Sequence, residues 1–179
     1  MNVVQPIRNK RDIDRMKKAL HGRNLLLFTF GINSALRVSD LLKLKVGDVR
    51  GKEIIRIKEK KTGKTKTFRL NKAIVKAVAE LVPADTPDDA PLFPSRKGTA
   101  AITRQQAYRV LNDAADRAGL SLDIGTHTMR KTMAYHAYKA GVDLTLLMTI
   151  LNHSSQRETL KYIGITQQSI DEVYINVNL

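Results

Sequence analysis

Four residues between positions 127 and 162 have side chains suited to holding a phosphate and attacking it: His127, Arg130, His153 and Tyr162. Arginine stays charged at any biological pH and grips phosphate oxygens with a two-toothed fork. Tyrosine can act as a covalent nucleophile, but its free pKa is about 10, so it needs cationic or basic neighbours to lose its proton. His127 and Arg130 fall on one face of a helix. The pattern therefore favours phosphoryl-transfer chemistry.

A second arginine, Arg37, lies in the apolar segment 34–44. An unpaired guanidinium would be costly in such surroundings, so we expect a partner for it. Asp40 follows on the same stretch, and two interpretations stay open. The two residues form a buried structural ion pair, or Asp40 orients Arg37 while its fork faces an anionic ligand.

The charge of the chain indicates a polyanionic partner. Its 179 residues carry 31 Lys and Arg against 17 Asp and Glu, a net charge of +14. A generic basic surface is the alternative, but nucleic acid is the commonest partner of such a chain. The absence of cysteine excludes disulfides, thiolate zinc sites and cysteine nucleophiles. No apolar run approaches the roughly 20 residues that span a bilayer, and no signal peptide opens the chain, so we expect a soluble, cytoplasmic protein with no membrane partner.

The elements that must position these residues are mainly helices. The length predicts one domain over residues 1–179. Apolar spacing, caps and glycine stops predict helices over about 10–20, 23–33, 71–82, 103–118, 126–140 and 144–151, with Thr126 capping the one that carries His127. With one hairpin over about 53–70, this predicts an α+β, mainly α-helical fold in which a small antiparallel sheet packs against a helical core.

The register of that hairpin follows if the turn is placed at Thr62-Gly63, since glycine tolerates positive φ. The opposed pairs are then Ile55 with Leu70, Ile57 with Phe68, and Glu59 with Lys66. This register leaves Lys61 and Lys64 at an exposed tip. The tip is either simply solvated or inserted into a DNA groove.

The C-terminal tail, residues 167–179, shows apolar alternation from Val173 to Leu179. Such period-two spacing predicts a strand with one apolar face, which must add to a sheet edge. The strand can fold back on its own domain or dock on a neighbouring protomer.

The order Arg37, Lys61, His127-x-x-Arg130, His153, Tyr162 resembles the tyrosine recombinases of the phage-integrase family. The resemblance runs from about residue 10 to the tail. The matching motifs are Ala35-Leu36-Arg37-Val38-Ser39-Asp40-Leu41, Lys61-Thr62-Gly63, His127-Thr128-Met129-Arg130 and Leu151-Asn152-His153. Ala35 and Asn152 stand where the family usually has glycine, and Lys131 where histidine is common, which puts loop geometry rather than chemistry in question.

The resemblance implies a catalytic-domain fold and a set of roles. Tyr162 would attack a DNA phosphodiester, form a 3′-phosphotyrosyl link and release a 5′-hydroxyl. Arg37, Arg130 and His153 would stabilise the developing charge, Lys61 would protonate the leaving oxygen, and His127 would assist proton transfer at Tyr162. Asp40 would contact and orient Arg37 without touching the substrate. Four lysines would contact DNA: Lys60, Lys64, Lys66 and Lys131. No metal or other cofactor is required, because two arginines do the work of a Lewis acid.

The expected partner is double-stranded DNA, with self-association into a tetramer on recombination sites and a nucleoid location when DNA is bound. Two alternatives remain: a non-catalytic DNA-binding regulator and a type IB topoisomerase-like enzyme that relaxes DNA. The N-terminal DNA-binding domain usual in the family is absent from the sequence. The chain is therefore either a catalytic fragment or a naturally short member.

Overall fold

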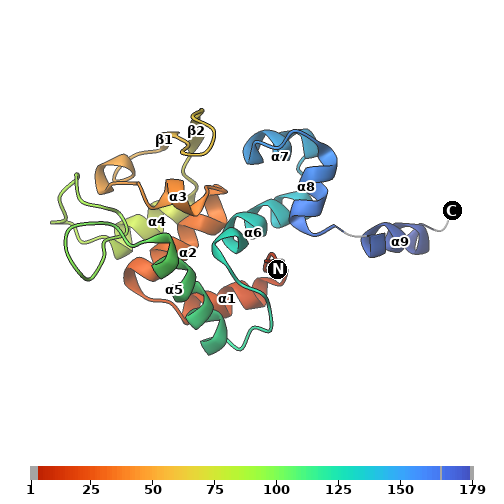
Figure 1. Cartoon of the computed structure of the whole chain (residues 1–179), viewed down its shortest axis with the longest axis horizontal. Helices are drawn as coiled ribbons and strands as arrows, with labels where there is room; N and C mark the ends of the chain where they lie inside the picture. The colour runs from red at the N-terminus through yellow and green to blue at the C-terminus, as the bar shows by residue number, and fades with distance from the viewer. Residues whose placement is uncertain (1–3, 166, 178–179) are drawn as a thin grey trace.

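The structure is a computed structural model that describes residues 4–165 and 167–177. Helices dominate it, and two strands form an antiparallel hairpin at its edge (Figure 1). The elements are α1 (Lys10–Lys18), α2 (Gly22–Ser34), α3 (Val38–Leu41), the 3-10 turn η1 (Val46–Asp48), β1 (Ile54–Lys58), β2 (Thr65–Arg69), α4 (Lys72–Leu81), α5 (Arg104–Arg117), α6 (Thr126–Lys139), α7 (Leu144–Leu151), α8 (Gln156–Ile163) and α9 (Gln167–Asn176). The mainly helical α+β class is confirmed.

Helix α2 forms the centre of the fold, with α1, α3, α4 and α6 packed around it. It is apolar on nearly every side, and Leu27, Phe28 and Phe30 are fully buried. Gly31 allows α6 to approach closely, since a Cβ there would lie 2.3 Å from Met129 Sδ. The first turns of α6, which carry His127 and Arg130, are thereby fixed against the core.

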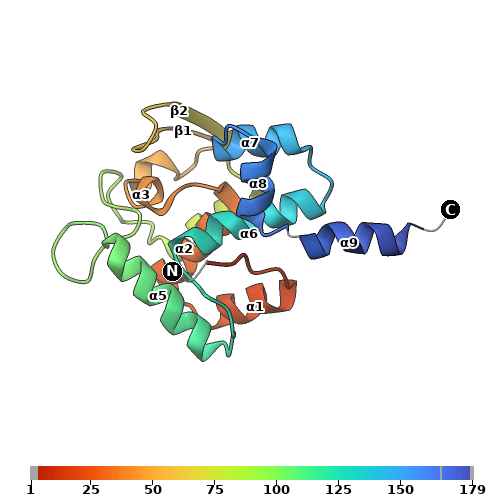
Figure 2. The ribbon, with the colours of Figure 1, turned by 45° about the vertical axis from the view of Figure 1, so that its right-hand side comes forward.

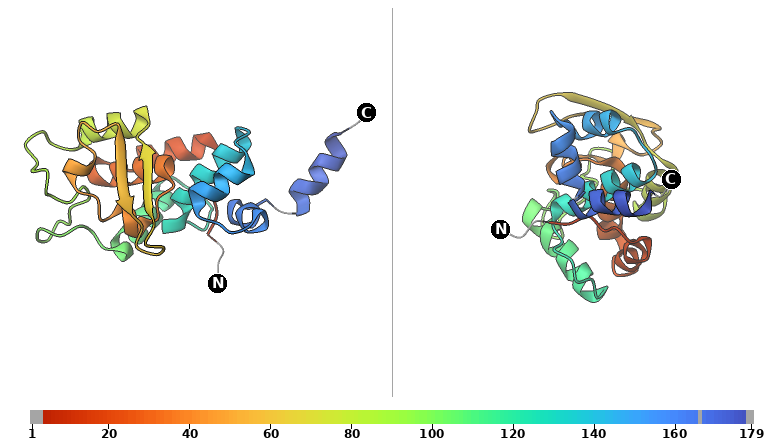
Figure 3. Two further views of the ribbon diagram at one scale, coloured as in Figure 1. Left: turned by 90° about the horizontal axis from the view of Figure 1, so that it is seen from above. Right: turned by 90° about the vertical axis from the view of Figure 1, so that its right-hand side faces the viewer.

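Two hydrophobic clusters of unequal size hold the described residues together. The large cluster joins α1 to α5 and includes Met129 of α6. The small C-terminal cluster contains the fully buried residues Ala35, Ala134, Leu151 and Ile163, around which the second half of α6 packs with α7 and α8. Figures 2 and 3 show α7 and α8 beside the β1–β2 hairpin, so the two clusters meet along a seam next to the hairpin.

The six predicted helices are confirmed to within two residues at each end. The cap of α6 is an exception, since Gly125 rather than Thr126 occupies the N-cap position. Its backbone N–H donates to Thr128 Oγ1 at 3.0 Å, so a threonine inside the helix provides the capping oxygen. Helix α8, which carries Tyr162, was not predicted, although Ser155 caps it in the ordinary way by accepting from Glu158 N.

The predicted hairpin register is wrong by two residues. Ile55 pairs with Phe68 and Ile57 pairs with Lys66, because the loop is longer than a two-residue turn. The backbone of Glu59 bonds to Lys64 O and to Gly63 N, which leaves residues 60–63 as the tip. A shift of two keeps the same side chains on the same face, so Ile55 still faces the core, but Glu59 is free of Lys66 and turns inward.

The predicted tail strand is also wrong, because residues 167–176 form helix α9. The sequence also offers helical spacing at Ile170, Val173, Tyr174 and Val177, over a longer stretch than the alternation. Residues 178 and 179 of the predicted strand lie outside the described residues. Helix α9 projects away from the body of the molecule (Figure 1), with Tyr174 and Ile175 exposed.

Candidate active site

Arg130 is the most deeply buried cation of the site. Its side chain is 3 % exposed, and its two terminal nitrogens donate to the backbone oxygens of Ala35 and Leu151. These oxygens belong to the C-terminal ends of α2 and α7. Burial lowers the pKa of Arg130, but a guanidinium remains charged at neutral pH. The arrangement holds a permanent positive charge in one orientation at the seam between the two clusters.

Helix α8 brings Tyr162 to the first turns of α6. The Tyr162 hydroxyl lies 3.5 Å from His127 Nδ1, and its ring packs edge-to-face on His153 with 5.0 Å between centroids. Lys131 Nζ lies 5.0 Å from the centre of the same ring. The structure therefore places the nucleophile candidate beside both predicted histidines and near Arg130.

The electrostatic surroundings of Tyr162 favour a protonated phenol in the free protein. Burial raises the pKa of Tyr162, and the charges of Arg130 and Arg37 offset this only in part. Burial also lowers the pKa of His127, and nearby cations including Arg104 and Arg130 act in the same direction. His127 is therefore neutral at physiological pH and can accept the phenol proton when the phenol reacts.

Arg37 precedes α3 and faces the same site, with a partner that the sequence did not suggest. Its Nη1 lies 3.0 Å from Glu59 Oε2, in an ion pair whose carboxylate is buried and whose arginine side chain is 16 % exposed. The predicted pairing of Arg37 with Asp40 is wrong. Among the described residues the carboxylate of Asp40 makes no ion pair, and its Oδ1 accepts from Lys60 N at 2.8 Å. Asp40 thus positions the hairpin tip rather than Arg37 directly.

The four hairpin lysines of the predicted set have two kinds of surroundings. Lys60 and Lys61 are exposed in the tip, and Lys64 is exposed next to it. Lys66 is half-buried, and its Nζ donates to Ile150 O at 2.9 Å, which joins β2 to α7. Burial, aided by the charge of Arg130, lowers the pKa of Lys66 to about 8. Lys66 is therefore part of the site's charge balance, whereas Lys61 stands on an exposed loop outside the buried group.

His153 is held by residues of α8 that the sequence analysis missed. Its Nδ1 lies 3.0 Å from Thr159 Oγ1, and its Nε2 lies 3.9 Å from Glu158 Oε1. Burial lowers the pKa of His153, while the charge of Glu158 acts in the opposite direction. From the sequence, Glu158 and Thr159 could be linked to the site only if the segment that carries Tyr162 were predicted to be a helix.

The two departures from the family's glycines keep a glycine-like backbone. Ala35 has φ 51° and Asn152 has φ 55°, and they are the only non-glycine residues with positive φ among those described. Each ends a helix in the left-handed conformation, at a cost of about 1 kcal/mol for a residue with a Cβ. The loops next to Arg37 and His153 therefore retain the turn that glycine would give.

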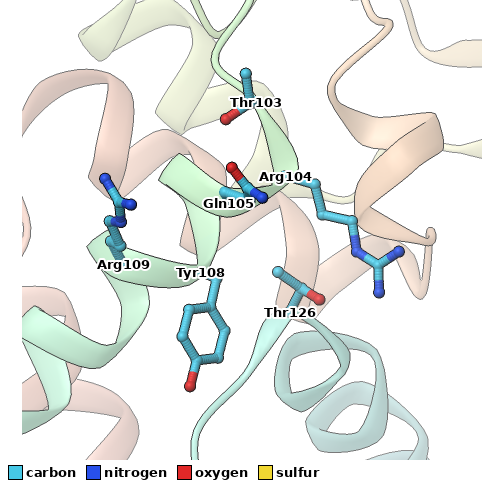
Figure 4. A pocket seen from close by; sticks show the side chains of 6 residues that line it. All are labelled: Thr103, Arg104, Gln105, Tyr108, Arg109 and Thr126. Atoms are coloured by element: carbon cyan, nitrogen blue, oxygen red, sulfur yellow. The ribbon is translucent and has the colours of Figure 1, made fainter.

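A second basic surface adjoins the site along α5. A cavity of about 800 Å³ is lined by Thr103, Arg104, Gln105, Tyr108, Arg109 and Thr126. Figure 4 shows Arg104 and Tyr108 reaching from α5 toward Thr126 in the first turn of α6. The cavity does not contain Tyr162, but the charge of Arg104 lowers the pKa of the neighbouring His127. Arg104 thus adds positive charge beside the site.

The described residues contain neither a metal-binding cluster nor a membrane-spanning helix. Over residues 4–165 and 167–177, no three histidine, aspartate or glutamate side chains are grouped so as to hold a metal ion together. In the same part of the chain no helix has the length and apolar character needed to cross a membrane.

The sequence matches the model of the phage integrase family over residues 8–169. It is 41 % identical over 177 residues to the probable integrase/recombinase YoeC of Bacillus subtilis, covering 97 % of both chains. It is 32 % identical over 164 residues to the tyrosine recombinase XerD of Corynebacterium glutamicum, covering 87 % of this chain and 52 % of that protein. The chain thus spans nearly all of one curated relative and about half of the other.

Solved structures show the same fold. The XerA recombinase matches with a TM-score of 0.79 at 22 % identity, over 99 % of this chain and 68 % of that one. The catalytic domain of bacteriophage HP1 integrase matches with a TM-score of 0.63 at 21 % identity, over 97 % of this chain and 95 % of that one. With the family model covering most of the sequence, the chain belongs to the phage integrase family, the tyrosine recombinases.

Proposed function

We propose that the chain is a metal-independent strand transferase that cuts and rejoins double-stranded DNA through a 3′-phosphotyrosyl intermediate at Tyr162. The observation that carries the proposal is the position of the Tyr162 hydroxyl, 3.5 Å from a neutral His127 and next to the fixed cation Arg130. Relatives named integrase and recombinase support strand exchange over the regulator and topoisomerase alternatives.

In the proposed step, the Tyr162 oxygen forms a bond to phosphorus and the bond from phosphorus to the 5′-oxygen breaks. His127 takes the phenol proton, and Lys61 gives a proton to the leaving 5′-oxygen. Arg37, Arg130 and His153 bind the non-bridging oxygens, where negative charge grows. A 5′-hydroxyl of another strand then reverses the step, since the phosphotyrosyl link conserves the energy of the broken bond.

DNA is the proposed partner because the charge of +14 includes cations gathered around the site. Lys60 in the hairpin tip and Lys64 next to it are proposed to face the DNA backbone, together with Lys66 on β2 and Lys131 beside Tyr162. Solved relatives include XerH bound to its difH substrate and λ integrase bound to a core site, which is consistent with this partner. Binding of this kind releases counterions and weakens steeply with salt.

Helix α9 is the proposed contact between protomers in a tetramer on DNA. It stands away from the body, and Tyr174, Ile175 and Val177 are 80 %, 76 % and 58 % exposed. An amphipathic helix with uncovered apolar residues is expected to dock its apolar face in a groove of a partner. A chain ending before Gln167 should form smaller complexes on a DNA site while still binding DNA, and unchanged stoichiometry would argue against this role.

The main test is the covalent adduct with DNA. Tyr162→Phe should abolish the adduct and leave DNA affinity within a few-fold, because it removes only the phenol oxygen. Tyr108→Phe, which changes an exposed tyrosine on α5, is the matched control and should form the adduct normally. The reaction of the unaltered chain should proceed in EDTA. An adduct that persists in Tyr162→Phe would contradict the assignment, and a metal requirement would contradict the mechanism.

A further inference from the structure

Glu59 is a buried carboxylate that the proposed reaction does not use. Its side chain is 1 % exposed, although it stands in the basic run Lys58 to Lys61. Its Oε2 contacts groups from three separate segments: Arg37 Nη1 at 3.0 Å, Thr62 Oγ1 at 2.8 Å and Asn152 Nδ2 at 2.8 Å. One carboxylate oxygen thus joins the arginine, the hairpin tip and the corner that precedes His153.

Burial would raise the pKa of Glu59, but hydrogen bonds from Thr62 and Asn152 and the charge of Arg37 outweigh it, and the pKa lies below its ordinary value. Glu59 is therefore ionised at neutral pH. Its charge also acts on Arg130 and on Lys66. Three cations of the site, Arg37, Arg130 and Lys66, thus have this carboxylate as a neighbour.

The pairing of Arg37 is incomplete in a way that leaves room for a second anion. Among the described residues, Arg37 Nη1 and Glu59 Oε1 are buried without a hydrogen bond, so the ion pair is a close contact and not a two-toothed one. The arginine side chain is 16 % exposed, whereas the carboxylate is closed off from solvent. Part of the Arg37 side chain is thus accessible to a phosphate, whereas Glu59 is enclosed by protein.

We propose that Glu59 is a resident anion that positions Arg37 before DNA arrives and opposes the binding of a phosphate at the same arginine. It is a positioning residue, since it touches Arg37 and not the reacting atoms. The inference rests on the proposed function only in taking Arg37 as a phosphate ligand. A carboxylate that shares Arg37 with a phosphate repels it in the ground state but keeps the guanidinium aimed for the transition state.

Glu59→Gln separates charge from shape, because glutamine keeps an acceptor oxygen for Thr62 and Asn152. The probe is tungstate, a tetrahedral oxyanion, titrated against the protein without DNA and followed by the imidazole NMR signals of His127 and His153. We expect Glu59→Gln to bind tungstate about tenfold more tightly, because a repelling charge is removed. The same variant should cleave DNA more slowly at saturating substrate while its KM falls. A purely structural Glu59 would give weaker or unchanged tungstate binding, which would overturn the proposal.

Glu53→Gln is the matched control. It removes one negative charge just before β1 of the same hairpin, but Glu53 is exposed and pairs with the exposed Arg69. Its tungstate affinity should stay within about twofold of the unaltered chain, since exposed charges are well screened. A gain equal to that of Glu59→Gln would show a general charge effect and overturn the assignment to Glu59.

A measurement on the unaltered chain keeps the proposal testable if Glu59→Gln does not fold. The carboxyl carbon of Glu59, followed by NMR, should titrate at higher pH when tungstate is bound, because a second negative charge then faces Arg37, Arg130 and Lys66. An unchanged titration would overturn the proposal. These measurements need no DNA cleavage, so a failure of the adduct test and a failure of this inference are distinguishable.

Discussion

The C-terminal side of the site and the hairpin tip contribute to the same proposed reaction but are built in opposite ways. Arg130 is buried and held by the backbone oxygens of two helix ends. Lys61 is exposed on a loop, and its charge acts on Glu158 across the surface. Groups that stabilise charge gain from being fixed in advance, since reorganisation then costs nothing during reaction. A proton donor has to reach the leaving oxygen only once DNA is bound, so a movable loop is suited to it.

The largest effect is expected from Arg130→Ala, which removes a cation and leaves the oxygens of Ala35 and Leu151 without their donors. Adduct formation should fall by roughly 10²–10³ or more, the scale for one lost transition-state donor. The free energy of unfolding should also fall by about 2–4 kcal/mol, because two buried acceptors lose their partner. Adduct assays and urea unfolding would measure both losses. An unchanged free energy of unfolding in this variant would contradict the view that Arg130 is held rigidly by these two oxygens.

Lys61→Ala should reduce cleavage by about 10²-fold or more, as expected for loss of a general acid, without lowering the unfolding temperature. A DNA substrate with sulfur in place of the leaving 5′-oxygen should restore most of the rate, because a thiolate with a pKa of about 8.5 leaves without a proton. Lys58→Ala is the control on β1, where the side chain is also exposed. If the sulfur substrate does not restore the cleavage rate of Lys61→Ala, a residue other than Lys61 is the general acid.

Lys66 should make the stability of the folded chain depend on pH in the mildly alkaline range. Burial lowers its pKa to about 8 from the ordinary value of about 10.4. The folded chain therefore loses this proton before the unfolded chain does, and the contribution of Lys66 to stability rises from about pH 8 to about pH 10.4. In urea unfolding, the unaltered chain should gain stability relative to Lys66→Met between pH 7.5 and 9.5. A constant difference between the two would contradict the burial of the ammonium.

The smallest effects are expected at Lys60 and Lys64. Each change to alanine should weaken DNA binding a few-fold and lower the slope of log affinity against log salt by about 1, as for one lost phosphate contact. The unfolding temperature should not change, because both side chains are exposed. Binding isotherms at several salt concentrations would test this. An unchanged slope would favour the simply solvated tip.

Local patterns in the sequence were enough for six of the helices and for the residue types of the site. Arg37, His127, Arg130, His153 and Tyr162 could be selected because their order and neighbours are distinctive, and the structure places the last four within one small region. Helical spacing also located α6 to within one residue, since its caps and stops are local signals.

The parts that failed depend on partners distant in the sequence. The predicted register paired Glu59 with Lys66 across the hairpin. In the structure the Glu59 side chain turns inward and contacts Arg37 and Asn152, and neither of these residues lies in the hairpin. The same inward turn lengthens the loop and shifts the register. The alternation of seven residues predicted a strand for the tail, although the same stretch also has helical spacing. The spacing of the apolar residues alone did not distinguish a strand from a helix.

The double contact of Arg130 has a consequence for how activity can be lost. Ala35 caps the end of α2, the helix at the centre of the fold, but it packs in the small cluster with Leu151 at the end of α7, so one guanidinium ties the ends of these two helices together. A small cluster opens at a lower free energy than a large core. Partial opening that frees α7 and α8 would withdraw His153 and Tyr162 together while α1 to α5 remained folded. Mild heat or denaturant should therefore silence the enzyme well before its helices are lost, and cooling should restore it.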